Sequence, residues 1–283
     1  MTREKQMNAQ DLRSVLENSN DKFNILTDET VLSQYTLKVR ELVELIDDFL
    51  SDEQKAQLLA CDYYTKKSAF IRSQIIMTIS DDKIKFDLLK KFEMESETNI
   101  DYVLSIMNSL SQDGKIQLLH TQDLLQQYHI TTLQIENIVR SLSEEKQIEV
   151  LADKDFVQNE LHISRNDIFE FILGFENEQI KLEMIDLYEF RNDQIANIIK
   201  TFTYDSKISI LINNKYQLGK QNIKDIILTL NVNQLVEFIK EHEKFFTQNG
   251  ISVYEITKYF NKEMQLDFIN KMEETNLSLV EKY

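Results

Sequence analysis

The side chains that could carry out catalytic chemistry are few and scattered in this sequence. Its four histidines, His120, His129, His162 and His242, include no HExxH zinc-binding pattern. Cys61 is the single cysteine, so neither a CxxC zinc site nor an internal disulfide can form. A nucleophilic Cys61 paired with a distant histidine is one alternative, but the residue pattern favours an inert thiol.

Phosphate-binding loops and informative carboxylate pairs are missing as well. The four glycines stand far apart, so GxGxxG, P-loop and GxSxG motifs cannot form. Neighbouring carboxylates are frequent in a chain with 48 Asp and Glu residues, so they say little about acid–base catalysis. We therefore expect no enzyme, no metal site and no cofactor.

The remaining candidate for a functional residue is a lysine that recurs at the same position of a repeated segment. The segment "SQDGKIQLL" from Ser111 reappears as "SEEKQIEVL" from Ser143, and nine segments of this kind align. Counted from the starting residue as zero, the fourth residue is usually Lys or Gln, and the fifth, seventh and eighth are apolar. The starting residues are Asn18, Ser51, Asp81, Ser111, Ser143, Asn177, Thr203, Asn231 and Asn261.

These starting residues recur every 26 to 34 residues, a spacing typical of helical repeats. Asn, Ser, Asp and Thr are preferred N-caps, so each segment predicts the start of a helix, which we name an A helix. Apolar residues at i, i+1 and i+4 before most starting residues predict a second helix, the B helix. Variable segments such as "HTQDLLQQYH" connect A to B. The expected caps of several B helices are Ser96, Thr131, Ser164 and Ser252.

A pair of helices of this length cannot bury its apolar faces alone, so neighbouring pairs must stack. The absence of proline and the four glycines also favour helices over strands. We expect an all-α fold, a right-handed α-solenoid of about nine two-helix repeats of about 30 residues. It would form one elongated domain over residues 1–283, with an N-terminal cap at 1–17, repeats at 18–275 and a C-terminal tail at 276–283.

This pattern resembles the tetratricopeptide-like and HEAT-like helical-repeat proteins over most of the chain. The resemblance is one of architecture, because the consensus Trp, Gly and Pro positions of tetratricopeptide repeats are missing. It implies a curved scaffold that offers a long concave surface to a partner.

The recurring lysine falls inside the apolar arc of the predicted A helix, which spans roughly 160°. A lysine there can lay its methylene stem on apolar surface and reach an acidic side chain or the last carbonyls of the preceding B helix. We favour this structural role over a row of charges that binds acidic ligands. In the other repeats the position holds Gln147, Leu235 and Gln265. The lysines are Lys22, Lys55, Lys85, Lys115, Lys181 and Lys207.

The sixth position of every segment is polar and is expected to face water. It is mostly acidic in the later repeats and could form a negative stripe for a basic partner, although an ordinary solvated face is the favoured alternative. The candidate partner-binding residues are Asp87, Gln117, Glu149, Glu183, Glu237 and Asp267.

The formal charge of −16 disfavours nucleic acids and anionic membranes and favours a basic protein or peptide partner. The beginning "MTREKQMNAQ" has no apolar signal-peptide core, and no run approaches 18 apolar residues. We expect no membrane insertion. With a single cysteine, we expect a cytoplasmic location, or a host cytosol if the protein is a delivered effector.

The function expected from these features is that of a non-enzymatic scaffold for protein–protein interaction. It would bind and regulate or inhibit a basic protein, as an adaptor, an immunity protein or an antagonist of an effector. A regulator that senses a peptide in the concave groove is the alternative. A repeat protein that reads RNA bases is opposed by the charge.

Overall fold

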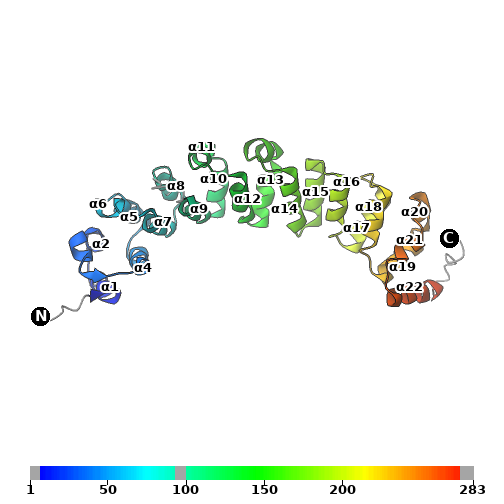
Figure 1. The fold of residues 1–283 in the computed structure, drawn as a ribbon, viewed down its shortest axis with the longest axis horizontal. Coiled ribbons are helices and arrows are strands. Elements are labelled where there is room, and N and C mark those ends of the chain that lie inside the picture. Colours follow the sequence, from blue (N-terminus) through cyan, green and yellow to red (C-terminus); the bar gives the residue numbers. More distant parts are fainter. Residues whose placement is uncertain (1–6, 93–99, 275–283) are drawn as a thin grey trace. The chain divides into compact units, whose positions relative to one another are not determined.

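The computed structural model describes residues 7–92 and 100–274 of the 283-residue chain (Figure 1). Within these ranges the chain forms 23 helices and two very short strands, β1 (Met7–Asn8) and β2 (Tyr35–Thr36), which pair in parallel. The prediction of an all-α fold is confirmed. The chain divides into two compact units, Met1–His162 and Ile163–Tyr283, and each is described by itself.

The helices of the first unit, apart from the short connecting helices described below, follow the predicted order: a B helix, then an A helix, then the next B helix. Helix α1 lies in the predicted N-terminal cap and contacts α4, and α4 in turn contacts α7. The A helices contact one another in the same way, as α2 does with α5 and α5 with α8. The B helices are α1 (Ala9–Glu17), α4 (Val39–Phe49), α7 (Ala69–Met77), α9 (Ile100–Asn108) and α12 (Thr132–Arg140). The A helices are α2 (Lys22–Thr27), α5 (Asp52–Leu59), α8 (Asp82–Leu89), α10 (Gln112–Leu119) and α13 (Glu144–Ala152).

The second unit continues the alternation with four helices of each kind in its described residues. Its B helices contact in chain order, α14 with α16 and α16 with α18, and its last two A helices, α19 and α22, also pack together. The B helices are α14 (Arg165–Gly174), α16 (Asn192–Ile199), α18 (Lys220–Ile227) and α21 (Val253–Thr257). The A helices are α15 (Glu178–Tyr188), α17 (Tyr204–Asn213), α19 (Val232–Glu241) and α22 (Lys262–Glu274).

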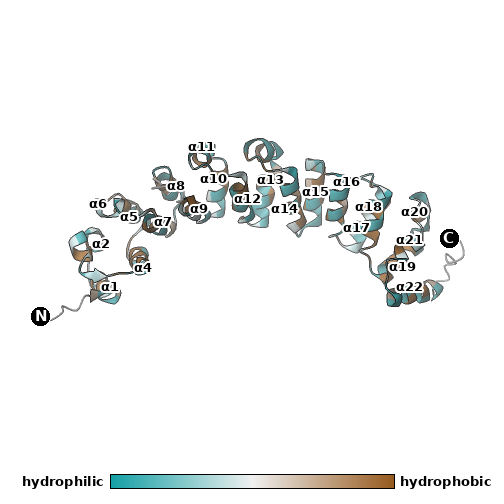
Figure 2. Ribbon diagram, viewed as in Figure 1, coloured by the Kyte–Doolittle hydropathy of each residue, from teal (hydrophilic) through white to brown (hydrophobic). Residues whose placement is uncertain are grey.

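Amphipathic spacing explains why these segments are helical and which face each one buries. Most helices in Figure 2 contain both hydrophobic and hydrophilic residues, as expected for a helix with one buried face and one exposed face. In α9, for example, Val103, Ile106 and Met107 are three and four residues apart and are completely buried. None of the described helices has the length and apolarity that crossing a membrane would need.

Most of the predicted N-caps are confirmed. A side-chain oxygen of the starting residue accepts a hydrogen bond from a backbone amide in the first turn of seven A helices. Thr203 takes the N-cap position of α17 without such a bond. Thr131, Ser164 and Ser252 cap their B helices, and Ser96 lies outside the described residues.

The predicted cap at Asn18 is wrong. Asn18 ends α1 as its C-cap, and its side-chain amide donates to the carbonyl oxygen of Ser14 at 2.7 Å. The following A helix, α2, begins only after Asp21. Asn is also a common residue at helix C-termini, so its type alone does not distinguish the two ends of a helix.

The variable connectors between A and B helices are often helical themselves, which we did not predict. Each of these short helices follows an A helix and buries apolar side chains, such as Tyr64, Phe156 and Phe246. Burial, rather than length or intrinsic propensity, stabilises helices this short. They are α3 (Glu29–Leu32), α6 (Asp62–Thr65), α11 (Gln122–Gln127), the π-helix η2 (Phe156–Glu160) and α20 (Glu243–Gln248).

A recurring turn leads into five of the B helices. One residue takes a left-handed conformation with φ between 49° and 62°, and it is followed by an apolar residue and the N-cap, as in Gly250-Ile251-Ser252. Each of these B helices carries an isoleucine four residues after the cap, which is the spacing of a hydrophobic staple. The left-handed residues are His129, His162, Glu189, Gln217 and Gly250.

In the first unit, two buried tyrosines in or next to connecting helices form hydrogen bonds to the A helix of the previous repeat. The Tyr64 hydroxyl donates to the carbonyl oxygen of Leu26 at 2.9 Å. The Tyr128 hydroxyl lies within hydrogen-bond distance of the carbonyl oxygens of Leu89 and Phe92. These carbonyls end α8 and the turn after it, so each tyrosine satisfies backbone groups that the helix itself leaves unpaired.

Candidate functional site

The repeated lysines lie mostly inside the protein. Five of them are at most 8% exposed, and the sixth, Lys22, is half-buried with its ammonium above the Phe49 ring. Burial lowers the pKa of Lys85, Lys115 and Lys207, because a buried ammonium loses hydration. The five buried lysines are Lys55, Lys85, Lys115, Lys181 and Lys207.

In the first unit, two lysines bind the end of the B helix that follows them in the chain. The Lys55 Nζ lies 3.0 Å from the carbonyl oxygen of Thr78, and the Lys85 Nζ lies 2.5 Å from that of Ser109. Lys55 also pairs with Asp47 on the preceding helix α4, at 2.6 Å. We predicted an acidic side chain or the last carbonyls of the preceding B helix. Lys55 does pair with an acidic side chain, but the carbonyls that Lys55 and Lys85 bind belong to the following B helix.

The second unit combines both kinds of partner at Lys181. Its Nζ lies 3.2 Å from the carbonyl oxygen of Leu173 in the preceding helix α14, and 2.9 Å from the hydroxyl of Thr201 after α16. The glutamines at the same position bind the preceding B helix, Gln147 through Leu142 and Gln265 through Phe260. In these five repeats the fourth position therefore joins an A helix to a neighbouring B helix through polar bonds, as well as through the buried stem.

A second polar link joins consecutive A helices at their N-termini. The first residue of one A helix accepts a hydrogen bond from the backbone amide of the residue that caps the next A helix. For the three pairs in the first unit the distances are 2.7 to 3.1 Å. The pairs are Asp52–Asp81, Asp82–Ser111, Gln112–Ser143 and, in the second unit, Glu178–Thr203.

Sequence reasoning missed this link. Acidic residues after an N-cap are expected from the helix dipole alone, so their type gave no sign of a partner in the next helix. The bonds of this link affect the pKa of Asp52. Burial acts to raise the pKa of Asp52, but the amides of Asp81 and Ser80 and the ammonium of Lys55 outweigh it and lower the pKa.

The Asp82 carboxylate also explains the glycine in α10. A Cβ atom on Gly114 would stand 2.6 Å from the Cγ of Asp82, well inside van der Waals contact. Glycine leaves the space that Asp82 needs to reach the amide and the hydroxyl of Ser111.

Replacing Gly114 with alanine should lower the free energy of unfolding by about 1 kcal/mol, although alanine alone would favour the helix by a similar amount. The cause is the displacement of Asp82 and the loss of its bonds to Ser111. Urea denaturation of purified variants measures the change. A Cβ on Gly174 meets nothing within 4 Å, so Gly174→Ala should be neutral or stabilising. In an Asp82→Ala background Gly114→Ala should stabilise, and a loss of the same size there would contradict the explanation.

The predicted partner-binding residues lie one to a helix on the A helices. Five of the six are exposed, and the Asp267 side chain is 48% exposed. Each lies on a different helix, so in each unit they form a spaced row rather than a cluster. They are Asp87 on α8, Gln117 on α10, Glu149 on α13, Glu183 on α15, Glu237 on α19 and Asp267 on α22.

Neighbouring lysines neutralise part of this row. Asp87 pairs with Lys90 at 3.6 Å, Glu149 with Lys146 at 2.9 Å and Asp267 with Lys271 at 3.3 Å. All three pairs lie within one helix and their carboxylates are 48 to 59% exposed, so each pair is weak and can exchange for another partner.

The negative field is clearest beside α19. Burial and the carboxylates of Glu237 and Glu241 together raise the pKa of Tyr204 to about 12. This local negative potential would also stabilise a cation placed near Glu237.

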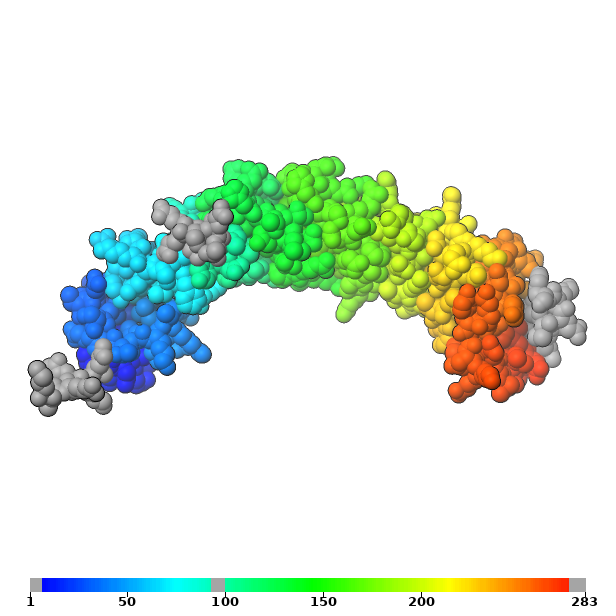
Figure 3. Space-filling view, in the orientation of Figure 1, coloured from blue at the N-terminus to red at the C-terminus, as the bar shows by residue number. Residues whose placement is uncertain are grey.

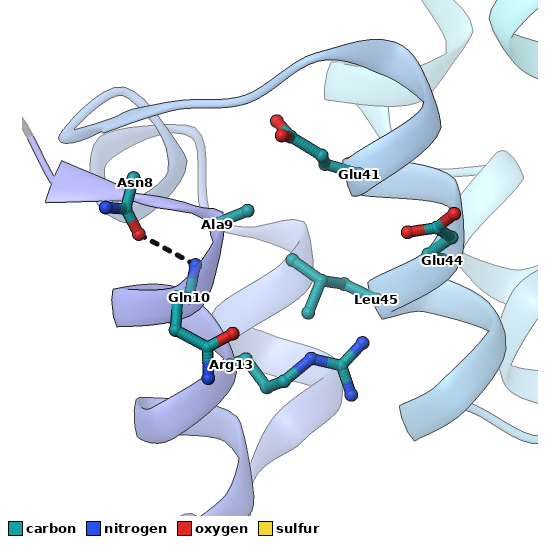
Figure 4. A pocket seen from close by; sticks show the side chains of 7 residues that line it. All are labelled: Asn8, Ala9, Gln10, Arg13, Glu41, Glu44 and Leu45. Carbon is teal, nitrogen blue, oxygen red and sulfur yellow. Dashed lines mark hydrogen bonds between the residues drawn. The ribbon is translucent and has the colours of Figure 1, made fainter.

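A polar cavity of about 490 Å³ lies between α1 and α4 (Figure 4). Its charged residues already have partners in the protein. Arg13 pairs with Asp48 at 2.5 Å, Glu44 with Arg40 at 2.7 Å, and Glu41 accepts the amide of Lys38. The Arg13–Asp48 pair joins α1 to α4, and the other two bonds lie within α4 and its N-cap.

A larger cavity of about 680 Å³ lies beside α5, α7 and α8 in the same unit. Apolar residues such as Ile76 and Leu88 form much of its wall. Two sixth-position residues, Gln57 and Asp87, border it from consecutive A helices. The sequence pattern indicated no hollow here, because it places residues on helix faces but does not show how closely two helices pack.

The histidines and the cysteine have structural contacts. The His120 ring stacks on Phe156 at 4.0 Å, and His129 and His162 occupy the left-handed turns. The Cys61 thiol donates to the carbonyl oxygen of Gln57 at 3.4 Å. Across residues 7–92 and 100–274, no three His, Cys, Asp or Glu side chains gather as metal ligands would.

No protein-family model matches the sequence, and no curated protein matches it significantly. The chain is an all-α helical protein compatible with a helical-repeat fold.

Proposed function

We propose that the protein is a non-enzymatic interaction scaffold, an acidic right-handed α-solenoid of about nine helical repeats. It binds a basic protein partner in the cytoplasm and regulates or inhibits it. The observation that carries this proposal is the exposed polar residue at the sixth position of successive A helices, on helices whose buried faces repeat the same contacts.

The buried contacts support a recognition role because they fix the spacing of the exposed residues within each unit. Polar bonds of the fourth position join five of the A helices to B helices, and four pairs of consecutive A helices are joined through the first residue. A rigid row of side chains loses little conformational entropy on binding. The charge of −16 would speed association with a basic partner.

The test begins with a partner recovered by pull-down from the source cell and then purified. Reversing three charges of the row, Glu149→Lys, Glu183→Lys and Glu237→Lys, should slow association about tenfold and reduce its dependence on salt. Stopped-flow mixing at several salt concentrations measures both.

A control variant with the same net charge reverses three exposed acids off the row, Glu160, Glu170 and Glu243. It should keep most of the association rate. Equal losses in the two variants would show that only net charge matters and would contradict the proposed row. A chain that binds no protein at any salt concentration but turns over a substrate would overturn the proposal as a whole.

A second candidate function, a regulator that senses a peptide, is favoured by the 680 Å³ cavity beside α5 and α8. Its wall combines apolar residues with charged residues of both signs, among them Asp87, Arg72 and Lys91, so it would suit a peptide with an apolar side chain and polar flanks. A small-angle scattering profile that stays unchanged across candidate peptides would count against this function.

A further inference from the structure

We infer that the exposed face of α22 is an interface at which two copies of this chain pack antiparallel. Helix α22 is the last helix of the described second unit and forms part of its surface (Figure 3). It packs on α19, but the equivalents of its exposed apolar residues in earlier A helices are buried or half-buried.

The eighth position shows the difference most clearly. It is 2% exposed at Ile185, 3% at Leu211 and 1% at Ile239, but 44% at Ile269. The fifth position is buried in α17 and α19, whereas Leu266 in α22 is 61% exposed. Two side chains that other elements cover elsewhere in this unit are therefore open to solvent on α22, three residues apart and on one face.

The exposed residues on this side of α22, which we call the seam, are arranged symmetrically, and this arrangement indicates which partner fits. Lys262, Leu266, Ile269 and Glu273 follow one another at spacings of four, three and four residues, so they share one side of the helix. Both charged residues of the seam are exposed. The spacing is the same in both chain directions, and the two end residues have opposite charges, Lys262 positive and Glu273 negative.

A second copy in antiparallel orientation complements this seam. Around a two-fold axis between Leu266 and Ile269, each Leu266 meets the Ile269 of the other copy, and each Lys262 meets a Glu273. The pairing is isologous, and it places two opposite-charge pairs at the ends of an apolar centre, as a polar rim does around an interface core. A parallel pair would instead bring like charges together.

Sedimentation equilibrium of the full chain tests the interface. The wild type should show a monomer–dimer equilibrium, and Leu266→Glu combined with Ile269→Glu should abolish the dimer. Leu133 on α12 is 66% exposed and serves as the matched control, so Leu133→Glu should leave the dimer unchanged. A dimer lost equally in this control would overturn the assignment to α22.

A charge swap tests the antiparallel register. Lys262→Glu and Glu273→Lys should each weaken the dimer about tenfold, and the double variant should recover it because both opposite pairs are rebuilt with reversed signs. Recovery supports the register, and no recovery in the double variant overturns it. A wild type that stays monomeric at every concentration and salt overturns the interface and leaves this face to residues 275–283 or to another protein.

Discussion

Replacing Lys85 with alanine should lower the free energy of unfolding by about 3 kcal/mol. The substitution removes three buried methylene groups, at about 0.8 kcal/mol each, from a side chain that is 3% exposed. It also leaves the carbonyl oxygen of Ser109 without its ammonium partner, which adds about 1 kcal/mol. Urea denaturation followed by circular dichroism measures the difference from the wild type.

Two further variants separate the stem from the charge. Lys85→Met keeps the stem and removes an ammonium whose pKa is lowered by burial, so it should lose only about 1 kcal/mol. Leu235 is completely buried at the same position of α19, which indicates that an apolar side chain fits there. Lys83 is exposed on the same helix, and Lys83→Ala should change stability by less than about 0.5 kcal/mol. If Lys85→Met is as unstable as Lys85→Ala, the ammonium bond dominates instead of the stem.

The lysine position shows what sequence periodicity can and cannot predict. The helical wheel places the fourth position of an A helix inside the apolar arc, and the structure buries Lys85. The wheel describes one helix and contains no information about which neighbour lies above a given residue. Whether the carbonyls that Lys55 and Lys85 bind come from the preceding or the following B helix therefore depended on the three-dimensional packing.

Helix starts were predictable because a local rule determines them. Ser111 caps α10 with its own hydroxyl, and that contact spans only three residues. The bond from Ser111 to Asp82 spans 29 residues and joins two helices, so no short pattern reveals it. The same contrast separates the confirmed caps from the missed link between A helices.

The short connecting helices escaped prediction for a related reason. Helix α11 is only six residues long, and an isolated helix of that length is unstable in water. It exists because Leu124 and Leu125 are buried against the rest of the first unit.

The sequence pattern predicted the solvent exposure of the candidate row at the sixth position. Whether a lysine pairs with Asp87 or Asp267 depends on side-chain rotamers and packing.

Tyr128 provides a stability test with a defined pH dependence. Replacing it with phenylalanine removes one hydroxyl, so the carbonyl oxygen of Phe92 loses this donor, while that of Leu89 keeps the backbone amide of Phe92. An unsatisfied buried polar group costs about 1 to 3 kcal/mol, so Tyr128→Phe should lower the free energy of unfolding by about 2 kcal/mol near pH 8. Tyr259 is exposed, and Tyr259→Phe is the matched control with little expected change.

The difference between wild type and Tyr128→Phe should then shrink as the pH rises. Burial raises the pKa of Tyr128 to about 12, whereas a tyrosine in the unfolded chain ionises near pH 10. Between these values the unfolded chain loses a proton that the folded protein keeps, so the stability that Tyr128 contributes is complete below pH 10 and declines toward pH 12. Denaturation curves of both proteins from pH 8 to 11 measure this trend. A difference that stays constant over that range would show that the hydroxyl is not held between the two carbonyls.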